Sequence, residues 1–332
     1  MSRAVKFIAS LLFLLASLLF AGAAWWLQQP LPMKSEVVEV TVEPGMSARA
    51  VVQSLANGGV EVQPQLLYGW IRLSGQARQI KAGSYELSGQ LTPRALLDKL
   101  VRGEVAMRSV TLVEGLTFAQ WRGLLRNAPT LRPDTQGLSD AAIMEKLGRP
   151  GVHPEGRFFP DTYPYAKNSS DLVVLRRALQ EMDQRLAAAW ARRIPDSPLK
   201  SPDEALILAS IVEKETGRPG DRGQISGVFN NRLRKGMLLQ TDPTVIYGLG
   251  DKFDGNLRKR DLKADTPWNT YTRAGLPPTP IAMPGQDALL AAVQPATTSA
   301  LYFVARGDGS SEFSATLEQH NRAVRKYQLG TP

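Results

Sequence analysis

The chain has 332 residues, a hydrophobic fraction of 43% and a formal net charge of +9 at pH 7. This length predicts two domains with an appendage. The absence of cysteine excludes disulfides, thiol catalysis and thiolate metal sites. His153 and His320 are the only histidines and lack a ligand motif, which argues against a zinc site and a Ser–His–Asp triad. The Lys and Arg residues are scattered, so the charge fits an anionic polymer or anionic lipid as well as nucleic acid.

The chain starts with Arg3 and Lys6, followed by an uncharged run over residues 7–33 whose apolar part ends near Trp25 and Trp26. About 21 apolar residues suffice to cross a bilayer, and paired tryptophans suit its interface. Positive charge before the run predicts an N-terminus inside and a translocated body. A cleaved signal peptide is the alternative, because residues 21–23 (AGA) resemble a cleavage site. We favour the uncleaved anchor because the run is long for a signal; residues 28–35 then form a short linker.

Short strands and helices are predicted from Glu36 onward. Residues 38–42 and 83–87 have strand patterns, and Ser47 caps a helix that starts near Ala50. Residues 64–73 and 94–101 have helix patterns, the second of which stops at Gly103. A strand–turn–helix theme at 41–47 (TVEPGMS) is repeated at 111–117 (TLVEGLT). The first copy resembles the opening of a LysM glycan-binding module; a plain α/β packing unit is the alternative.

Residues 155–165 (EGRFFPDTYPY) combine four aromatic side chains with Glu155 and Asp161. We expect a rigid loop here, either as the wall of a saccharide cleft or as a loop packed down by its aromatic rings. Ser170 then caps a long helix that continues to about residue 189.

Residues 201–217 predict a buried helix. Ser201 suits the N-cap, Pro202 the first helical position, and Glu204 the partner position of a capping box. Residues 205–212 carry no charge, which indicates that protein surrounds this helix on most sides. Gly217 supplies a stop after the acidic end at residues 213–216 (EKET).

The two glutamates of this end point in different directions, because positions two apart on a helix diverge by about 200°. Glu215 continues the apolar stripe of Leu208, Ile211 and Val212, so it is the better candidate for a desolvated carboxyl with a raised pKa. A general acid near neutral pH needs such a pKa. Two solvated glutamates at a fraying helix end are the alternative interpretation.

The C-terminal part alternates between helices and irregular segments. Asp221 is predicted to cap a helix with Gln224 as its box partner, and Gly236 to end it. Residues 239–248 form a polar turn that enters an apolar strand or helix, and residues 250–279 are irregular but rich in Trp and Tyr. A helix over 286–293, a buried strand over 301–305, a hairpin into 312–314 and a helix over 320–327 complete the chain.

Four motifs together resemble the endolytic murein transglycosylases of the YceG-like family. They are 209–216 (ASIVEKET), 228–233 (VFNNRL), 240–248 (QTDPTVIYG) and 269–271 (NTY) with 275–278 (GLPP). The resemblance covers nearly the whole chain after Glu36 and is strongest from 155 to 317. It implies an α+β fold with an anchor and linker at 1–33, a small LysM-like α/β subdomain at 34–107 and a larger mixed α+β catalytic domain at 108–332, built around the buried helix.

The resemblance also implies an activity. Such enzymes are anchored in the inner membrane, act in the periplasm near the glycan-polymerising synthases, and cut nascent peptidoglycan between N-acetylmuramic acid and N-acetylglucosamine to leave 1,6-anhydro ends. Their catalytic glutamate falls on Glu215. Because the attacking oxygen is the muramyl O6 of the substrate, one carboxyl suffices, where ordinary glycosidases need two. No cofactor, metal or nucleic acid is expected. Candidates for holding the sugars are Gln240, Thr241, Asp242, Asn269 and Tyr271, with Glu155 and Asp161 as weaker ones; for each, a structural role in pinning the loops is an open alternative.

Two other functions remain open at this stage. A peptidoglycan-binding module that regulates glycan synthases without catalysis would keep the same motifs and differ only in turnover. A pyridoxal-phosphate lyase of aminodeoxychorismate would need a Schiff-base lysine and a cytoplasmic substrate, and the export signal argues against it.

Overall fold

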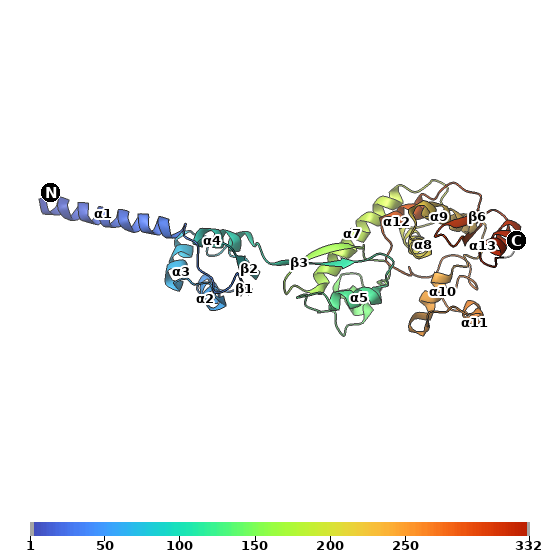
Figure 1. Cartoon of the computed structure of the whole chain (residues 1–332), viewed down its shortest axis with the longest axis horizontal. Coiled ribbons are helices and arrows are strands. Elements are labelled where there is room, and N and C mark those ends of the chain that lie inside the picture. The colour runs from blue at the N-terminus through green and yellow to red at the C-terminus, as the bar shows by residue number, and fades with distance from the viewer. Residues whose placement is uncertain (1–2, 331–332) are drawn as a thin grey trace. The chain divides into compact units, whose positions relative to one another are not determined.

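The computed structural model describes residues 3–330. In this part of the chain, helices are combined with three two-stranded sheets, β1-β2, β3-β4 and β5-β6, which confirms the α+β class (Figure 1). The chain divides into two compact units. The first comprises residues 3–108 with 165–169, and the second comprises residues 109–164 with 170–330.

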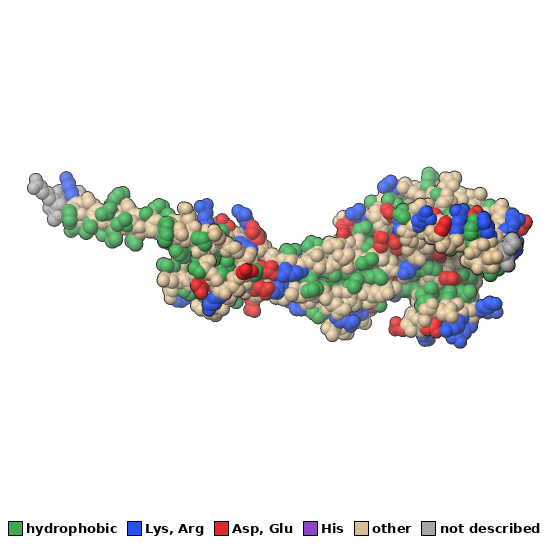
Figure 2. Space-filling view, viewed as in Figure 1, with side chains coloured by type: hydrophobic (Ala, Val, Ile, Leu, Met, Phe, Trp, Pro, Cys, Tyr) green, Lys and Arg blue, Asp and Glu red, His purple; other side chains and the backbone are tan. Residues whose placement is uncertain are grey.

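The N-terminal helix α1 (Arg3–Trp26) is long and apolar enough to cross a membrane over 22 residues, Val5–Trp26, and none of that span is buried. Figure 2 shows hydrophobic side chains along its exposed surface. The segment after α1, expected as a linker, is held by the first unit. The Leu31 N–H donates to the Leu91 carbonyl at 2.8 Å, the Lys34 N–H donates to the Gly59 carbonyl at 3.0 Å, and Leu31 is buried.

In the first unit, β1 (Val37–Val42) pairs antiparallel with β2 (Gly83–Ser88), and every second residue of β1 is buried. Helices α2 (Ala48–Gly58), α3 (Pro64–Leu73) and α4 (Pro93–Arg102) pack with them around one apolar core. The Ser47 hydroxyl accepts from the Ala50 N–H as predicted, and Gly59 ends α2 in the left-handed region at a φ of 112°.

The repeated strand–turn–helix theme is present in both places. Strand β3 (Met107–Leu112) leads to a turn and then to α5 (Phe118–Arg126), as β1 leads to α2. The Thr117 hydroxyl caps α5 as Ser47 caps α2. β3 pairs with β4 (Asp161–Ala166), so the prediction of a loop over 155–165 is wrong for its second half.

The second unit has four helices around its main apolar core: α7 (Asp171–Ala191), α8 (Pro202–Glu215), α9 (Pro219–Arg234) and α12 (Gln286–Val293). α6 (Asp140–Lys146) lies between β3 and β4 in the sequence. α10 (Asp242–Leu249), the 3-10 turn η1 (Gly250–Lys252) and α11 (Lys259–Lys263) follow α9. β5 (Tyr302–Ala305) and β6 (Ser311–Ser314) form the predicted hairpin, and α13 (Leu317–Tyr327) follows it.

Three local predictions need correction. α9 begins at Pro219 after Arg218, and Asp221 accepts from the Ser311 N–H at 2.8 Å instead of capping. A proline already has the φ of a first helical residue, so Pro219 sets the start. Ser201 caps α8 as predicted, but the Glu204 carboxylate accepts from the Lys200 N–H and leaves the capping box incomplete. Strand β5 was expected to be buried, but only Val304 is; Tyr302 and Phe303 are half-buried and Ala305 is exposed.

Candidate active site

Helix α8 carries eight consecutive buried residues, Ala205 to Val212, toward an acidic C-terminal end. The only polar residue among them is Ser210, whose hydroxyl both donates and accepts a hydrogen bond. It donates to the Ile207 carbonyl at 2.7 Å and accepts from the Ile281 N–H at 3.0 Å. The helix is therefore fixed on its surroundings just before it presents Glu213 and Glu215.

Glu215 is half-buried by surface area, and neighbouring atoms enclose its carboxyl group. The Thr241 hydroxyl donates a hydrogen bond to its Oε1. Desolvation raises the pKa of Glu215 to about 7; the Thr241 hydrogen bond and the charge of Arg232 oppose this rise, and the charge of Asp242 adds to it. A carboxyl with this pKa holds a proton on a substantial fraction of molecules at neutral pH, as a general acid must.

The position of Thr241 depends on a short, strained loop. Gln240, before it, has a φ of 49°, a left-handed conformation that few residues other than glycine adopt. The Gln240 N–H donates to the Thr270 carbonyl at 3.1 Å, and the Thr241 N–H donates to the Thr270 hydroxyl at 3.1 Å. The Thr244 hydroxyl donates to the Thr241 carbonyl at 2.8 Å. These bonds hold the Thr241 hydroxyl against Glu215.

Arg232 supports the same loop from α9. Its Nη1 donates to the carbonyls of Leu239 at 2.9 Å and Leu238 at 3.2 Å, and its Nε donates to the Leu301 carbonyl at 2.6 Å. Its guanidinium carbon lies 5.1 Å from the centre of the Tyr302 ring. The Arg232 side chain is buried despite its charge. An arginine near the C-terminal end of a helix, followed by Leu233 and Arg234, gives no local signal for this role.

Asp242 and Tyr271 lie at the more open side of Glu215. The Tyr271 hydroxyl donates to Asp242 Oδ1 at 2.6 Å, and Asp242 is exposed. Gln240 is exposed as well. The structure therefore brings together four of the predicted sugar-contacting residues with Glu215: Gln240, Thr241, Asp242 and Tyr271.

Glu213 differs from Glu215 in its partners more than in its burial. Only 6% of its side chain is exposed, and desolvation raises its pKa as well. Its Oε2 accepts from the Gly285 N–H at 2.9 Å, and its Oε1 lies 4.0 Å from Nη2 of Arg222. Glu215 is the better candidate for desolvation, and the larger rise in pKa is found there, but Glu213 is desolvated too, because the segment before α12 contacts it on the other face of the helix. Glu213 binds this segment.

Glu155 is a third buried carboxyl. It is 3% exposed and accepts from the Phe118 N–H at 3.1 and 3.2 Å and from the Tyr247 hydroxyl at 3.2 Å. Desolvation raises its pKa to about 7. The Phe118 N–H lies in the first turn of α5 and has no acceptor within the helix. A carboxylate is therefore favourable at this position.

Glu155 lines a cavity of about 800 Å³ whose wall includes residues of α5 and of α10. Its wall includes the rings of Tyr247 and Trp268, whose centres are 5.6 Å apart. Glu215 does not line this cavity, but its sequence neighbour Lys214 does, as does Pro243 next to Asp242. The cavity therefore lies beside the carboxyl group rather than around it.

Comparison with known proteins identifies the family. The profile of the YceG-like family matches residues 40–326. The chain belongs to the YceG-like family. A Bacillus subtilis protein named endolytic murein transglycosylase is 31% identical over 307 residues, 87% of this chain and 84% of that protein. A Streptococcus pneumoniae protein of the same name is 27% identical over 98% of this chain and 66% of its own length.

A crystal structure of a yceG-like protein from Listeria monocytogenes superposes with a TM-score of 0.55 at 28% identity, covering 86% of this chain and 98% of that chain. The resemblance that the four motifs predicted is therefore confirmed at the level of the family.

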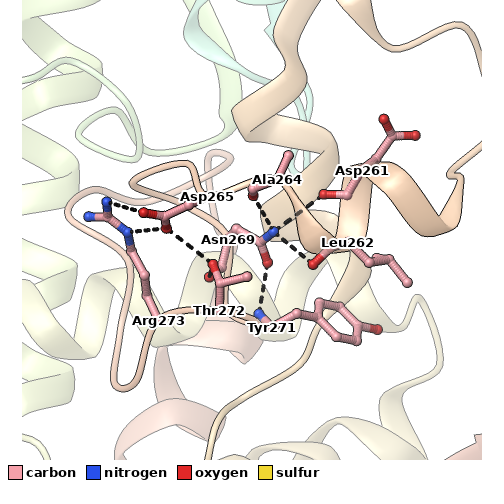
Figure 3. A network of polar contacts seen from close by, with 8 residues as sticks. All are labelled: Asp261, Leu262, Ala264, Asp265, Asn269, Tyr271, Thr272 and Arg273. Carbon is pink, nitrogen blue, oxygen red and sulfur yellow. Dashed lines mark hydrogen bonds and ion pairs between the residues drawn. The ribbon is translucent and has the colours of Figure 1, made fainter.

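The remaining predicted sugar contacts of this YceG-like chain lie in different surroundings. Asn269 is fully buried, and its amide is used within the protein (Figure 3). Its Oδ1 accepts from the Tyr271 N–H at 2.8 Å, and its Nδ2 donates to the Ala264 carbonyl at 2.7 Å and to the Leu262 carbonyl at 3.1 Å. Asp161 is exposed on β4 and accepts from its neighbour's N–H; it is not part of the cavity wall.

Proposed function

We propose that this chain is a membrane-anchored endolytic lytic transglycosylase that cleaves peptidoglycan glycan strands, with Glu215 as its single catalytic acid and base. The observation that carries the proposal is the enclosed carboxyl of Glu215, which has a pKa of about 7 and a hydroxyl donor on one oxygen. Membership of the YceG-like family and the names of the relatives support peptidoglycan as the substrate.

The proposed reaction needs two proton transfers by one group. Protonated Glu215 gives its proton to the glycosidic oxygen between N-acetylmuramic acid and N-acetylglucosamine as the C1–O bond breaks. The 2-acetamido carbonyl of the substrate stabilises the positive charge at C1. The muramyl O6 then bonds to C1, and the Glu215 carboxylate takes the O6 proton, which yields the 1,6-anhydro end and restores the acid. Water is neither consumed nor activated, so a second carboxyl is unnecessary.

The proposed sugar contacts around Glu215 are the exposed Gln240 and Asp242 and the half-buried Tyr271. Thr241 and Asn269 act through other residues, since the first holds Glu215 and the second holds the backbone of Tyr271. The neighbouring cavity with Glu155, Tyr247 and Trp268 is the proposed extension for a further part of the glycan strand, because ring faces and carboxylates suit sugars. Asp161 is proposed only as a sugar contact at the edge of the binding surface.

The domain plan follows the same proposal. Residues 1–33 would hold the chain in the inner membrane with the N-terminus inside, residues 34–107 would form the LysM-like subdomain, and residues 108–332 would form the catalytic domain in the periplasm. The apolar helix α1 supports the anchor, and a translocated body would meet both the glycan and its synthases.

The substitution Glu215→Gln tests the proposal, because glutamine keeps the shape and the acceptor oxygen but cannot give a proton. We expect turnover of uncrosslinked glycan strands to fall by about 10²- to 10⁴-fold. Chromatography with mass analysis of the ends measures the 1,6-anhydro product. Glu213→Gln is the matched control, since its amide oxygen still accepts from Gly285. Equal losses of turnover in both variants would refute the assignment of Glu215 as the catalytic acid. A Glu215→Gln protein with full turnover would show that the reaction does not use this carboxyl.

A further inference from the structure

Helix α3 has two apolar faces: one is buried in the core of the first unit, and the other is largely exposed, although its Trp70 also packs partly against that core. Leu67 and Ile71 are buried in that core. On the other side, Leu66 and Leu73 are 52% and 87% exposed, and Trp70 lies between them along the helix. Residues three, four and seven apart share one helix face, so these side chains form a continuous apolar stripe. We call Leu66, Trp70 and Leu73 the α3 stripe.

The α3 stripe forms one wall of an apolar groove whose opposite wall is α1. The groove has a volume of about 640 Å³, and α1 contributes residues from Leu18 to Trp26. Leu18 lies seven residues before Trp25, which corresponds to about 10 Å along a helix axis. The groove therefore extends along the last turns of the segment that is apolar enough to enter a membrane.

The segment between α1 and the core of the first unit is too short to move α3 away from a membrane. α1 ends at Trp26, and Leu31 is already buried in the core of the unit and hydrogen-bonded to Leu91. Five residue steps span at most roughly 17 Å. Whatever tilt α1 takes, the unit stays next to the point where α1 leaves the bilayer.

We propose that the α3 stripe is a membrane-docking surface, and that its partner is the lipid of the bilayer that holds α1. This inference rests on the proposed anchoring of α1. The 22 residues of Val5–Trp26 extend over about 33 Å, close to the thickness of a hydrocarbon core, which places Trp25 and Trp26 at the outer interface. A groove that reaches about 10 Å below this level matches the depth at which amphipathic interfacial helices lie.

Lipid is the occupant that the geometry favours over a soluble protein. One wall of the groove consists of α1 residues such as Leu18 and Leu19, which acyl chains surround once α1 spans the bilayer. A soluble partner could not reach them. The surface would place the first unit flat against the membrane, so the stripe acts as a second attachment point besides α1.

The absence of native cysteine allows a direct test with single spin labels on the full chain in vesicles of phosphatidylglycerol and phosphatidylethanolamine. Three variants are compared: Leu12→Cys on α1, Leu73→Cys on the stripe and Gln53→Cys on the exposed side of α2. Electron paramagnetic resonance measures the collision of each label with oxygen, which concentrates in lipid, and with a water-soluble nickel complex. We expect oxygen to dominate at positions 12 and 73 and the nickel complex to dominate at 53.

The three positions separate the possible failures. A label at 73 that collides mainly with nickel, while position 12 reports lipid, overturns the docking surface and leaves the anchor intact. A water-exposed label at 12 overturns the anchor itself, and the docking surface with it. Dipolar broadening between labels at 73 would show a second copy of the chain on the stripe and would also overturn the proposal. Circular dichroism of each variant confirms that the label has not unfolded it.

Discussion

At the scale of single residues, the geometry distinguishes the three buried carboxyls by what each one binds. Glu213 accepts from the Gly285 N–H, and Glu155 accepts from the Phe118 N–H and the Tyr247 hydroxyl. Both therefore join separate segments of the second unit. Glu215 accepts from one side-chain hydroxyl, that of Thr241, and stands beside exposed polar residues. Desolvation alone would not have separated them, since it raises the pKa of all three.

The pH dependence of the proposed reaction follows from Glu215. The first step needs the protonated acid, so kcat/KM should be constant at low pH and fall as the pH rises through about 7. Measurement from about pH 5 to about pH 9 gives the midpoint. Thr241→Val removes a hydrogen bond that lowers the pKa of Glu215, so the midpoint should move upward, and Thr241→Ser should restore it.

Glu155 also has a pKa of about 7, so the profile needs a control. The variant Glu155→Gln should keep the midpoint of the wild type if Glu215 sets it. A midpoint that disappears in Glu155→Gln, or that does not move in Thr241→Val, would contradict the assignment of the profile to Glu215.

Burial of Glu155 also predicts how stability depends on pH. Its pKa is raised from 4.5 to about 7, so the folded protein binds more protons than the unfolded chain between these values. Its contribution to the free energy of unfolding is therefore complete below about pH 4.5 and is lost as the pH rises through about 7. The Glu155→Gln variant should lack this pH-dependent loss, which is on the order of 3 kcal/mol in the free energy of unfolding over the window.

Urea unfolding of both proteins at several pH values measures this difference. Glu145→Gln, at an exposed position of the same unit, is the control and should follow the wild type at every pH. If the wild type and Glu155→Gln keep a constant difference over the window, the carboxyl is not titrating as described.

At the scale of elements, short-range signals predicted helices and strands well wherever one residue controls an end. Ser47 and Ser201 cap α2 and α8 as expected, and α3 and α12 have the expected bounds. Capping depends on a side chain and a backbone N–H a few residues apart, so the sequence contains the whole interaction. The family motifs likewise placed Gln240, Thr241, Asp242 and Tyr271 around Glu215 without contact information.

The failures share a long-range cause. Strand β4 forms because β3 offers a partner, and the Gly285 N–H that binds Glu213 comes from the distant segment before α12. Arg232 is buried because its guanidinium meets the distant Leu301 carbonyl as well as the carbonyls of Leu238 and Leu239 in the turn after α9. Each of these contacts joins residues that no local pattern connects, so propensity and periodicity could not predict them.

The irregular segment between α10 and α12 depends on Asn269, and this gives a prediction for the element. Its side-chain amide hydrogen-bonds to backbone carbonyls at the end of α11 and to the Tyr271 N–H, in place of bonds between backbone groups (Figure 3). Asn269→Ala removes these three hydrogen bonds, each worth about 1 kcal/mol, so the free energy of unfolding should fall by on the order of 3 kcal/mol. The rate of glycan cleavage should fall with it, because Tyr271 loses its position.

Urea unfolding measures the stability, and Thr272→Ala is the control because Thr272 is exposed in the same turn. The control should change stability by less than about 0.5 kcal/mol. An Asn269→Ala protein of unchanged stability would show that the turn is ordered by other contacts, such as the 2.7 Å ion pair of Arg273 with Asp265.

At the scale of the whole molecule, each compact unit has its own apolar core. Leu55 belongs to the core of the first unit, and Leu206 on α8 belongs to the main core of the second; both side chains are fully buried. Separate cores indicate separate cooperative units, since apolar burial provides most of the stabilisation and each leucine contributes to one core only. Although the strand–turn–helix theme occurs in both units, each copy belongs to its own unit.

Calorimetry of two cavity variants tests this division. Leu55→Ala and Leu206→Ala should each cost about 2 to 5 kcal/mol, because a buried leucine leaves a cavity that the surroundings fill only in part. We expect Leu55→Ala to lower the melting temperature of one transition and Leu206→Ala to lower that of another, with the second transition in each case unmoved. The first unit is the smaller one, so its shift per kcal/mol should be the larger. A single transition that both variants lower together would instead make the chain one cooperative body.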